Sequence, residues 1–295
     1  DNKLTTLLNE VEVINAGNQI TYFEILTAAF FYGCKKYSKN LTICEFGLFA
    51  RFDAVNILIN NLASIVTAIG LDHLDWLPKG QQNIKKIIFE KTSSLLNSKI
   101  IVAKQNSDEI NNHIINTISN NPSEKIMFNK DYNFTIKEND FFYYEDQLGA
   151  LKLPKPNLIG DFQLENVSTA IATARNLVNY KINDDHIING ITKIKSIARL
   201  QEIKEGKLKS LIKNNQLFVD GSHNPLGAKV LNQYLESLNC KKHIILGMMA
   251  NKDHNKYISY FKNISSLTTI DIPNQPNAIK GKALKEKLKD FANIQ

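Results

Sequence analysis

Short apolar runs alternate along the first half of the chain with stretches in which apolar residues recur at helical spacing. Three runs predict β-strands, and the first two end at glycines: Leu41–Phe46, Leu62–Ile69 and Lys99–Ala103. Three stretches predict helices, and the first is expected to be buried because apolar residues lie on most of its sides: Tyr22–Tyr37, Gln82–Leu96 and Asn106–Asn121. The pattern therefore predicts an α/β fold with a parallel sheet, whose ligands bind at the carboxyl ends of the strands.

The second half of the chain predicts an insertion, a linker and a second α/β unit. Aromatic alternation over Tyr132–Leu153, broken at Gln147–Gly149, predicts a β-hairpin insertion. A helix begins near Gln163, and Lys195–Ile203 is typical of a linker. The second unit has three predicted strands, Gln216–Val219, Lys242–Leu246 and Leu267–Ile272, and three helices, Pro225–Leu238, His254–Lys262 and Ala283–Phe291. We therefore expect a central domain over residues 1–194 and a smaller domain over residues 195–295.

The composition changes this picture little but excludes several classes of protein. With 295 residues, 43% hydrophobic and 22% charged, the chain can bury one large core or two smaller ones. No apolar run approaches the ~18 residues that a membrane span needs. Three cysteines, Cys34, Cys44 and Cys240, lie in apolar surroundings and are expected to be buried free thiols of a reducing compartment. A transmembrane protein and a secreted disulfide scaffold are excluded, and the cytoplasm is favoured.

The net charge of +7 comes from scattered lysines, because arginine occurs only at Arg51, Arg175 and Arg199. Nucleic-acid-binding proteins usually gather arginine on one face, so neither a nucleic acid nor a membrane is expected as a partner. A planar guanidinium binds phosphate or carboxylate through two parallel hydrogen bonds, which lysine cannot do. Arg51 and Arg199 both lie in motifs and are candidate site residues, whereas Arg175 is expected to be structural.

The string VDGSHNPLGA, Val219–Ala228, places polar groups where a strand passes into a helix. Asn224 can cap that helix and Pro225 suits its first turn. A helix start offers free N–H groups to an anion, with Asp220 and His223 beside it. A plain capped turn is the alternative, and the presence of both Asp220 and His223 favours a site.

The first unit carries Glu45 and His73 at the ends of two predicted strands. A carboxylate and an imidazole at adjacent strand ends can share a divalent ion and leave positions for water and phosphate oxygens. Two structural alternatives stay open: His73 can be a hydrogen-bonded core residue, and Glu45 can pair with Arg51.

Eight short motifs, in one order along the chain, carry a resemblance to a known family. They are TYFE (Thr21–Glu24), EFGLFARFDAVN (Glu45–Asn56), IGLDH (Ile69–His73), FEK (Phe89–Lys91), QLEN (Gln163–Asn166), ARLQ (Ala198–Gln201), DGSHNP (Asp220–Pro225) and LGMMANKD (Leu246–Asp253). With these motifs, nearly the whole chain resembles the folylpolyglutamate synthases and dihydrofolate synthases, cytosolic relatives of the Mur amino-acid ligases. The resemblance implies a Mur-ligase-like central parallel-sheet ATPase domain and a Rossmann-like C-terminal domain.

The family phosphorylates a substrate carboxylate with ATP and then lets the α-amine of glutamate attack the acyl phosphate. The resemblance implies that Glu45 and His73 hold Mg²⁺. It also implies that Lys91 and His223 are catalytic, with Lys91 matching the family's carbamylated lysine. An unmodified Lys91 paired with Glu90 is the alternative.

The resemblance also assigns the ligand contacts. ATP would be held from both sides of an interdomain cleft by Asn166, Arg199, Asp220 and His223, so that domain closure and nucleotide binding are coupled. Dihydropteroate or a reduced folate would lie against two groups of residues: Thr21, Tyr22, Phe23 and Glu24, and Phe52, Asp53 and Ala54. Tyr22 and Phe23 as ordinary core residues are the alternative. The implied partners are these small molecules and L-glutamate, with the protein a monomer.

Three departures from the family pattern matter. Gly-Lys occurs only at Gly206-Lys207 and Gly281-Lys282, neither inside a G-x-x-x-x-G-K-[ST] phosphate loop, which the family carries upstream of TYFE. With no initiator methionine, this predicts a fragment that lacks the phosphate loop and the extreme C-terminus and is inactive by itself. Phe49-Ala50 replaces the family's Gly-Gly pair, which removes backbone freedom beside the substrate. The residues after Lys91 also differ and put its carbamylation in question.

Two other functions stay open on the sequence alone. The chain could be another Mur-type amino-acid ligase, against which TYFE argues. It could also be a non-catalytic binding or scaffold protein, since no phosphate loop is present.

Overall fold

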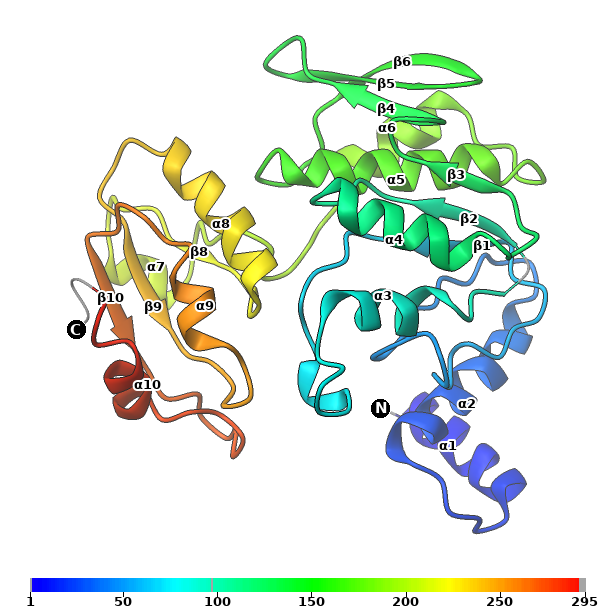
Figure 1. The fold of residues 1–295 in the computed structure, drawn as a ribbon, viewed down its shortest axis with the longest axis horizontal. Helices are drawn as coiled ribbons and strands as arrows, with labels where there is room; N and C mark the ends of the chain where they lie inside the picture. The colour runs from blue at the N-terminus through cyan, green and yellow to red at the C-terminus, as the bar shows by residue number, and fades with distance from the viewer. Residues whose placement is uncertain (1, 97, 292–295) are drawn as a thin grey trace.

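The computed structural model describes residues 2–96 and 98–291, which form two units lying side by side (Figure 1). We call residues 2–194 the central unit and residues 195–291 the C-terminal unit. A single connection after α6 (Asp184–Thr192) leads from one to the other. The division at residue 194 stays a prediction.

A parallel sheet covered on both faces forms the core of the central unit. Its strands, in the order β1-β2-β3, are Ala63–Val66, Lys99–Val102 and Lys125–Met127. Ile100 and Val102 of β2 pack with α3 (Ile84–Thr92) and α4 (Asp108–Ile118), while Ile101 packs with α5 (Phe162–Asn176) on the other face. The expected α/β fold is confirmed.

The predicted hairpin insertion is a three-stranded antiparallel sheet. It consists of β4 (Tyr132–Thr135), β5 (Phe141–Asp146) and β6 (Gly149–Pro154), and the turn lies between Asp146 and Gly149 as predicted. The buried Tyr132 hydroxyl anchors this sheet, because it donates to the Val102 carbonyl at 3.0 Å and lies 3.1 Å from Thr169 Oγ1 of α5.

Small sheets and short helices build the C-terminal unit. A parallel pair, β9 (His243–Leu246) with β10 (Ser266–Thr269), packs with three helices in one core: α8 (Pro225–Ser237), α9 (His254–Ile258) and α10 (Gly281–Lys287). In the described residues β8 (Phe218–Val219) pairs with β7 (Gln201–Glu202), not with β9, and α7 (Lys207–Leu211) connects them. The Rossmann-like layering is thus present with shorter strands than predicted.

Two predictions for the N-terminal region are wrong. α2 (Tyr22–Cys34) is a helix and packs against α1 (Asn2–Asn15), but only Thr27 and Ala29 of it are buried. Leu41–Phe46 is not a strand. A strand needs a partner to bond its backbone groups, and none lies beside this segment in the described residues. Ile43, with 83% of its surface exposed, shows that the apolar run is uncovered here.

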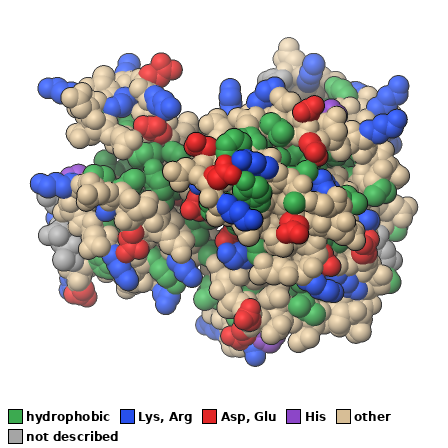
Figure 2. Space-filling model, turned by 90° about the horizontal axis from the view of Figure 1, so that it is seen from above, with side chains coloured by type: hydrophobic (Ala, Val, Ile, Leu, Met, Phe, Trp, Pro, Cys, Tyr) green, Lys and Arg blue, Asp and Glu red, His purple; other side chains and the backbone are tan. Residues whose placement is uncertain are grey.

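The surface and the cysteines add two observations. Figure 2 shows Lys and Arg side chains scattered among Asp and Glu on both units of the face it displays. All three cysteines are free, as predicted, but none is buried: Cys34 and Cys44 are half-buried and Cys240 is exposed. Within the described residues, no helix is long and apolar enough to cross a membrane.

Candidate functional site

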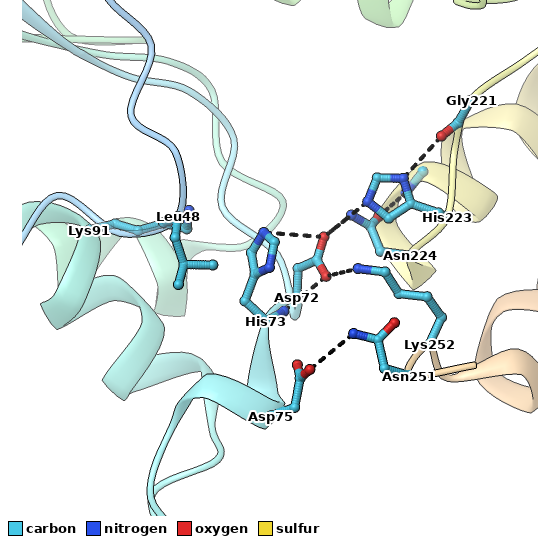
Figure 3. Close-up of polar contacts among 11 residues, drawn as sticks. Leu48, Asp72, His73, Asp75, Lys91, Gly221, His223, Asn224, Asn251 and Lys252 are labelled. Carbon is cyan, nitrogen blue, oxygen red and sulfur yellow. Dashed lines mark hydrogen bonds and ion pairs between the residues drawn. The ribbon is translucent and has the colours of Figure 1, made fainter. Parts of the chain in front are cut away.

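The two units meet where the loop after β1 faces the beginning of α8 and the loop after β9 (Figure 3). The loop after β1 carries the IGLDH string and ends in a short 3₁₀ helix, Leu74–Trp76. It therefore lies at the carboxyl end of a parallel strand, where ligands of such sheets bind.

The Asp72 carboxylate is the centre of this meeting point. Its Oδ1 lies 2.9 Å from Lys252 Nζ, and its Oδ2 accepts from Asn224 Nδ2 at 2.8 Å and lies 3.5 Å from His223 Nε2. The backbone N–H of His73 donates to Oδ1 at 2.9 Å. Burial works to raise the pKa of Asp72, but these hydrogen bonds outweigh it and hold the pKa far below its usual range. Asp72 is therefore an anion at any ordinary pH.

His73 follows directly and lies in a strained left-handed conformation, with φ of 56°. Its ring packs edge-on against Phe49, with 6.2 Å between the centroids. Burial lowers the pKa of His73, with the charges of Lys252 and Lys91 acting in the same direction against Asp72. A neutral imidazole is the form that can bind a metal ion.

The beginning of α8 contributes His223 and Asn224. Asn224 caps the helix as predicted, since its Oδ1 accepts from the Gly227 N–H at 2.9 Å, and its amide nitrogen is left for Asp72. The His223 ring bonds Asp72 through Nε2 and the Gly221 carbonyl through Nδ1, at 3.0 Å. The bond to Asp72 raises the pKa of His223, which favours the protonated ring.

Lys91 lies at the end of α3, on the same side of the sheet. Its Nζ donates to the Leu48 carbonyl at 3.0 Å and lies 5.6 Å from the centre of the Phe49 ring. Burial lowers the pKa of Lys91, while Asp72 and Asp53 act against it. The alternative pairing of Lys91 with Glu90 is wrong, because Glu90 pairs with Arg51 and Lys86.

The loop that follows Glu45 is held together by Asp53. The Asp53 carboxylate accepts from the backbone N–H groups of Gly47 at 2.9 Å, Leu48 at 3.3 Å and Val55 at 2.9 Å. Phe52 projects from the same loop with φ of 63° and is 91% exposed, and Ala54 is half-buried. Asp53 therefore shapes the loop that carries the other predicted substrate residues.

The TYFE string forms the beginning of α2. Thr21 Oγ1 accepts from the Glu24 N–H at 3.2 Å, and Glu24 Oε2 accepts from the Thr21 N–H at 2.8 Å, which makes a capping box. The spacing T-x-x-E is the sequence signature of such a box. Tyr22 is 80% exposed, so the alternative that it is a core residue is wrong. The Phe23 ring leaves no space for a side chain at Gly47, which places TYFE against the loop 46–56.

Glu45 and His73 do not meet in the structure. Glu45 is exposed and forms no ion pair with His73 or Arg51 among the described residues, so the alternative pairing with Arg51 is also wrong. Residues 2–96 and 98–291 contain no group of three His, Cys, Asp or Glu side chains that could hold a metal ion.

The remaining predicted nucleotide residues lie around the linker and on α5. Arg199 is exposed, and Asn166 is exposed and donates to Gln163 Oε1 at 3.2 Å. Asp220 accepts from the N–H groups of Leu200 and Ser222, both at 2.8 Å, so its carboxylate fixes the linker to β8. The structure thus brings His73, Lys91 and His223 around Asp72, and it leaves Arg199 and Asn166 outside that cluster.

Comparisons with known proteins were made on the sequence and on the fold. No protein-family model matches the chain. The chain is 27% identical over 245 residues to dihydrofolate synthase/folylpolyglutamate synthase of Buchnera aphidicola from Acyrthosiphon pisum, covering 82% of this chain and 55% of that protein. It is 25% identical over 263 residues to the Escherichia coli enzyme of the same name, covering 88% and 58%. The fold matches that of E. coli FolC in complex with DHPP and ADP, with a TM-score of 0.84, 24% identity and coverage of 99% and 66%.

The chain is similar to folylpolyglutamate synthases and dihydrofolate synthases over most of its length, and it shares the fold of E. coli FolC. It spans less than two thirds of the length of these relatives. A Yersinia pestis member complexed with AMPPNP and Mn ion also shares the fold, with a TM-score of 0.84, 21% identity and coverage of 99% and 66%.

Sequence reasoning missed two residues that shape the site. Asp72 and Lys252 lie inside the recognised strings IGLDH and LGMMANKD, but neither was singled out. Their roles depend on a contact between residues 180 positions apart, which no local pattern reveals. The one available signal was the occurrence of both charges in motifs at predicted strand ends.

Proposed function

We propose that this chain is the larger part of an ATP-dependent carbon–nitrogen ligase that joins L-glutamate to the carboxylate of dihydropteroate or a reduced folate. The observation that carries the proposal is the convergence of motifs from both units on one carboxylate, Asp72, with His73, Lys91 and His223 beside it. The names of the relatives, and the DHPP, ADP and AMPPNP of the related structures, support this substrate class.

The chemistry asks for a phosphoryl transfer and an acyl transfer. The substrate carboxylate oxygen takes the γ-phosphoryl group of ATP, which releases ADP. The glutamate amine then attacks the carbonyl carbon, phosphate leaves, and the amine gives up a proton. Both steps develop negative charge that positive groups must offset. His223 at the beginning of α8 is placed to serve that need, because its pKa is raised and half of its ring is exposed.

For Mg²⁺, the donor chemistry of His73 fits better than that of Glu45. Burial keeps His73 neutral with a ring nitrogen able to bind the ion, whereas the exposed Glu45 would have to turn toward it. We propose these two as protein ligands, with the remaining positions filled by water and phosphate oxygens. Mg²⁺ would supply charge neutralisation to the transferred phosphoryl group.

For ATP, we propose Asn166, Arg199, Asp220 and His223 as contacts. Arg199 is exposed beside the linker, so its guanidinium is accessible to a phosphate. Two backbone N–H groups already bond Asp220, which has acceptor positions left for a ribose hydroxyl.

For the pterin substrate, we propose that Thr21, Tyr22, Phe23 and Glu24 line one side and Phe52, Asp53 and Ala54 the other. The contact of Phe23 with Gly47 brings these two segments together. One face of the Phe52 ring lies near the Arg51 guanidinium, 4.7 Å from the ring centre, and the ring is otherwise exposed. Thr21 and Glu24 would act by shaping the helix start, because they bond one another.

We also propose that Lys91 reacts with CO₂. Its lowered pKa favours the neutral amine, whose nitrogen attacks the carbon of CO₂ and loses a proton to give a carbamate. The carbamate nitrogen keeps one hydrogen, so Nζ can still donate to the Leu48 carbonyl. The test is ¹³C NMR of the protein in ¹³C-bicarbonate, in which Lys91→Arg should abolish a carbamate signal.

The free thiols suit a reducing compartment, and we propose a cytoplasmic monomer.

The decisive experiment measures glutamate-dependent ADP release by the full-length protein, with dihydropteroate and tetrahydrofolate compared side by side. We expect release to require glutamate and at least one of the two pterins, and to fail in His73→Ala but not in His113→Ala on α4. ADP release that depends on neither dihydropteroate nor tetrahydrofolate would favour another ligase. No ADP release at all would favour a binding protein.

A further inference from the structure

We infer that Asp72 is the positioning residue that fixes the C-terminal unit against the central unit. Three donors converge on its carboxylate from two separate loops of the C-terminal unit: Asn224 Nδ2 at 2.8 Å, Lys252 Nζ at 2.9 Å and His223 Nε2 at 3.5 Å. The His73 N–H bonds the same carboxylate from within its own loop and fixes the direction in which it points.

Burial makes this contact stronger than an ordinary surface ion pair. The side chains of Asp72 and Lys252 are 17% and 16% exposed. Charges so little exposed are weakly screened by solvent, and each is costly to leave unpaired. The ion pair therefore favours the docked arrangement of the two units over a separated one, as long as both partners are charged.

Two further contacts between the units involve the same segment as Asp72. Asn251 Nδ2 donates to Asp75 Oδ2 at 3.0 Å, but both side chains are exposed. At Gly70 the backbone packs against Leu226 so closely that an added Cβ would lie 2.9 Å from Leu226 Cδ2. Residues 70–75 thus form a narrow contact with Asp72 at its centre.

The connection between the units leaves room for rotation. Ile194 packs with the core of the central unit, whereas Ala198 and Leu200 are bonded to Gly221 and Asp220 of the C-terminal unit. Between these anchors lie residues 195–197, of which Ile197 is 86% exposed. A connection this short and exposed acts as a hinge, so the orientation of the units depends on the contacts of Asp72.

This inference deepens the proposed function, because the same contact sets the distance between His73 and Lys91 on one unit and His223 on the other. Only the effect of this contact on catalysis rests on the proposed ligase function. The arrangement of the units can be measured without substrates, so its test stands even if the ligase proposal fails.

The test uses small-angle X-ray scattering and amide hydrogen exchange on the 295-residue chain. In Asp72→Asn, which keeps the shape and removes the charge, we expect a larger radius of gyration and at least about tenfold faster exchange at residues 222–227 and 249–253. Lys252→Met should do the same. The double variant should add little to either, because both single changes remove one contact.

Glu138→Gln is the matched control, since it removes the exposed pair with Lys152 inside the central unit and should leave scattering unchanged. Circular dichroism checks that each variant is folded. If Asp72→Asn does not fold, the scattering and exchange of Lys252→Met decide the test. Parent-like scattering and exchange in both variants would overturn the inference. So would faster exchange spread evenly through either unit, which would mean that Asp72 supports folding and not position.

Discussion

Arg51 and Glu90 form a two-pronged ion pair, with Nε 2.7 Å from Oε2 and Nη2 2.8 Å from Oε1. The Glu90 side chain is only 8% exposed, and its backbone carbonyl also accepts from the N–H groups of Ala50 and Arg51. Glu90 precedes Lys91 on α3, and Arg51 lies in the loop whose Leu48 carbonyl bonds Lys91. The pair therefore clamps the proposed substrate loop to the helix that carries Lys91.

Arg51→Lys should lower both the melting temperature and the ligase activity of the full-length protein. A lysine keeps the charge but cannot form the two parallel bonds, and the loop 46–56 would lose its fixed position. Arg175→Lys is the matched control, because Arg175 forms the same two-pronged pair with Asp146, outside the Asp72 cluster. Both variants should melt earlier, but only Arg51→Lys should lose activity. Equal activity in the two variants would contradict the clamp.

Docking of the two units should weaken as the pH rises through the raised pKa of His223. The pKa of His223 is raised by its bond to Asp72, so the protonated ring stabilises the folded, docked state. A raised pKa contributes fully below the unfolded value of ~6.5, and the contribution is lost as the pH rises through the folded value. Lys252 and Asp72 are the charged groups that face the ring, and the pKa of Asp72 is held far below this range. The effect should be small, because the ring is half exposed.

Proton NMR of the His223 ring measures this titration directly. In Asp72→Asn the midpoint should move down, because the bond that favours the charged ring loses its anion. A midpoint that is the same in the parent and in Asp72→Asn would show that the contact does not form in solution.

In the full-length protein, His73→Ala and Glu45→Ala should each reduce turnover at least about tenfold and raise the magnesium requirement. Each change removes a proposed ligand of the ion that neutralises the phosphates. The measurement is the rate of ADP release as a function of magnesium concentration, with Glu10→Ala on α1 as an acidic control. An unchanged magnesium dependence in His73→Ala would remove the metal assignment.

Elements whose stability is local were predictable from the sequence. The helices α3, α4 and α8 lie within predicted helices, and the predicted cap Asn224 bonds the backbone of α8. The structure shows Asn83 and Ser107 capping α3 and α4 in the same way. Leu41–Phe46 has the composition of a strand but no partner strand, and composition cannot supply one. The same limit applies to the burial predicted for α2, which depends on what covers the helix.

The site also has parts that the sequence predicts and parts that it does not. DGSHNP and IGLDH were recognised as site elements because polar residues at strand ends are a local signal. That both strings meet at Asp72 could not be read from the sequence, because the contact depends on how the two units dock. TYFE shows a different limit: the sequence analysis used it as a family motif and did not note its T-x-x-E spacing, which forms a capping box in the structure.

The 295-residue chain alone should bind Mg-ATP weakly and should not hydrolyse it. The sequence contains no G-x-x-x-x-G-K-[ST] loop, and the tightest hold on nucleotide phosphates comes from the backbone N–H groups and the lysine of such a loop. Arg199 and Asn166 are exposed and lie outside the Asp72 cluster, so they would have to order the nucleotide without that anchor. Losing several charge-assisted hydrogen bonds at ~1.5–3 kcal/mol each weakens binding by orders of magnitude. The test is calorimetry, which measures the affinity of this chain for Mg-ATP. The affinity of Arg199→Lys is measured beside that of the parent. Micromolar binding by the parent together with phosphate release would show that the residues present suffice.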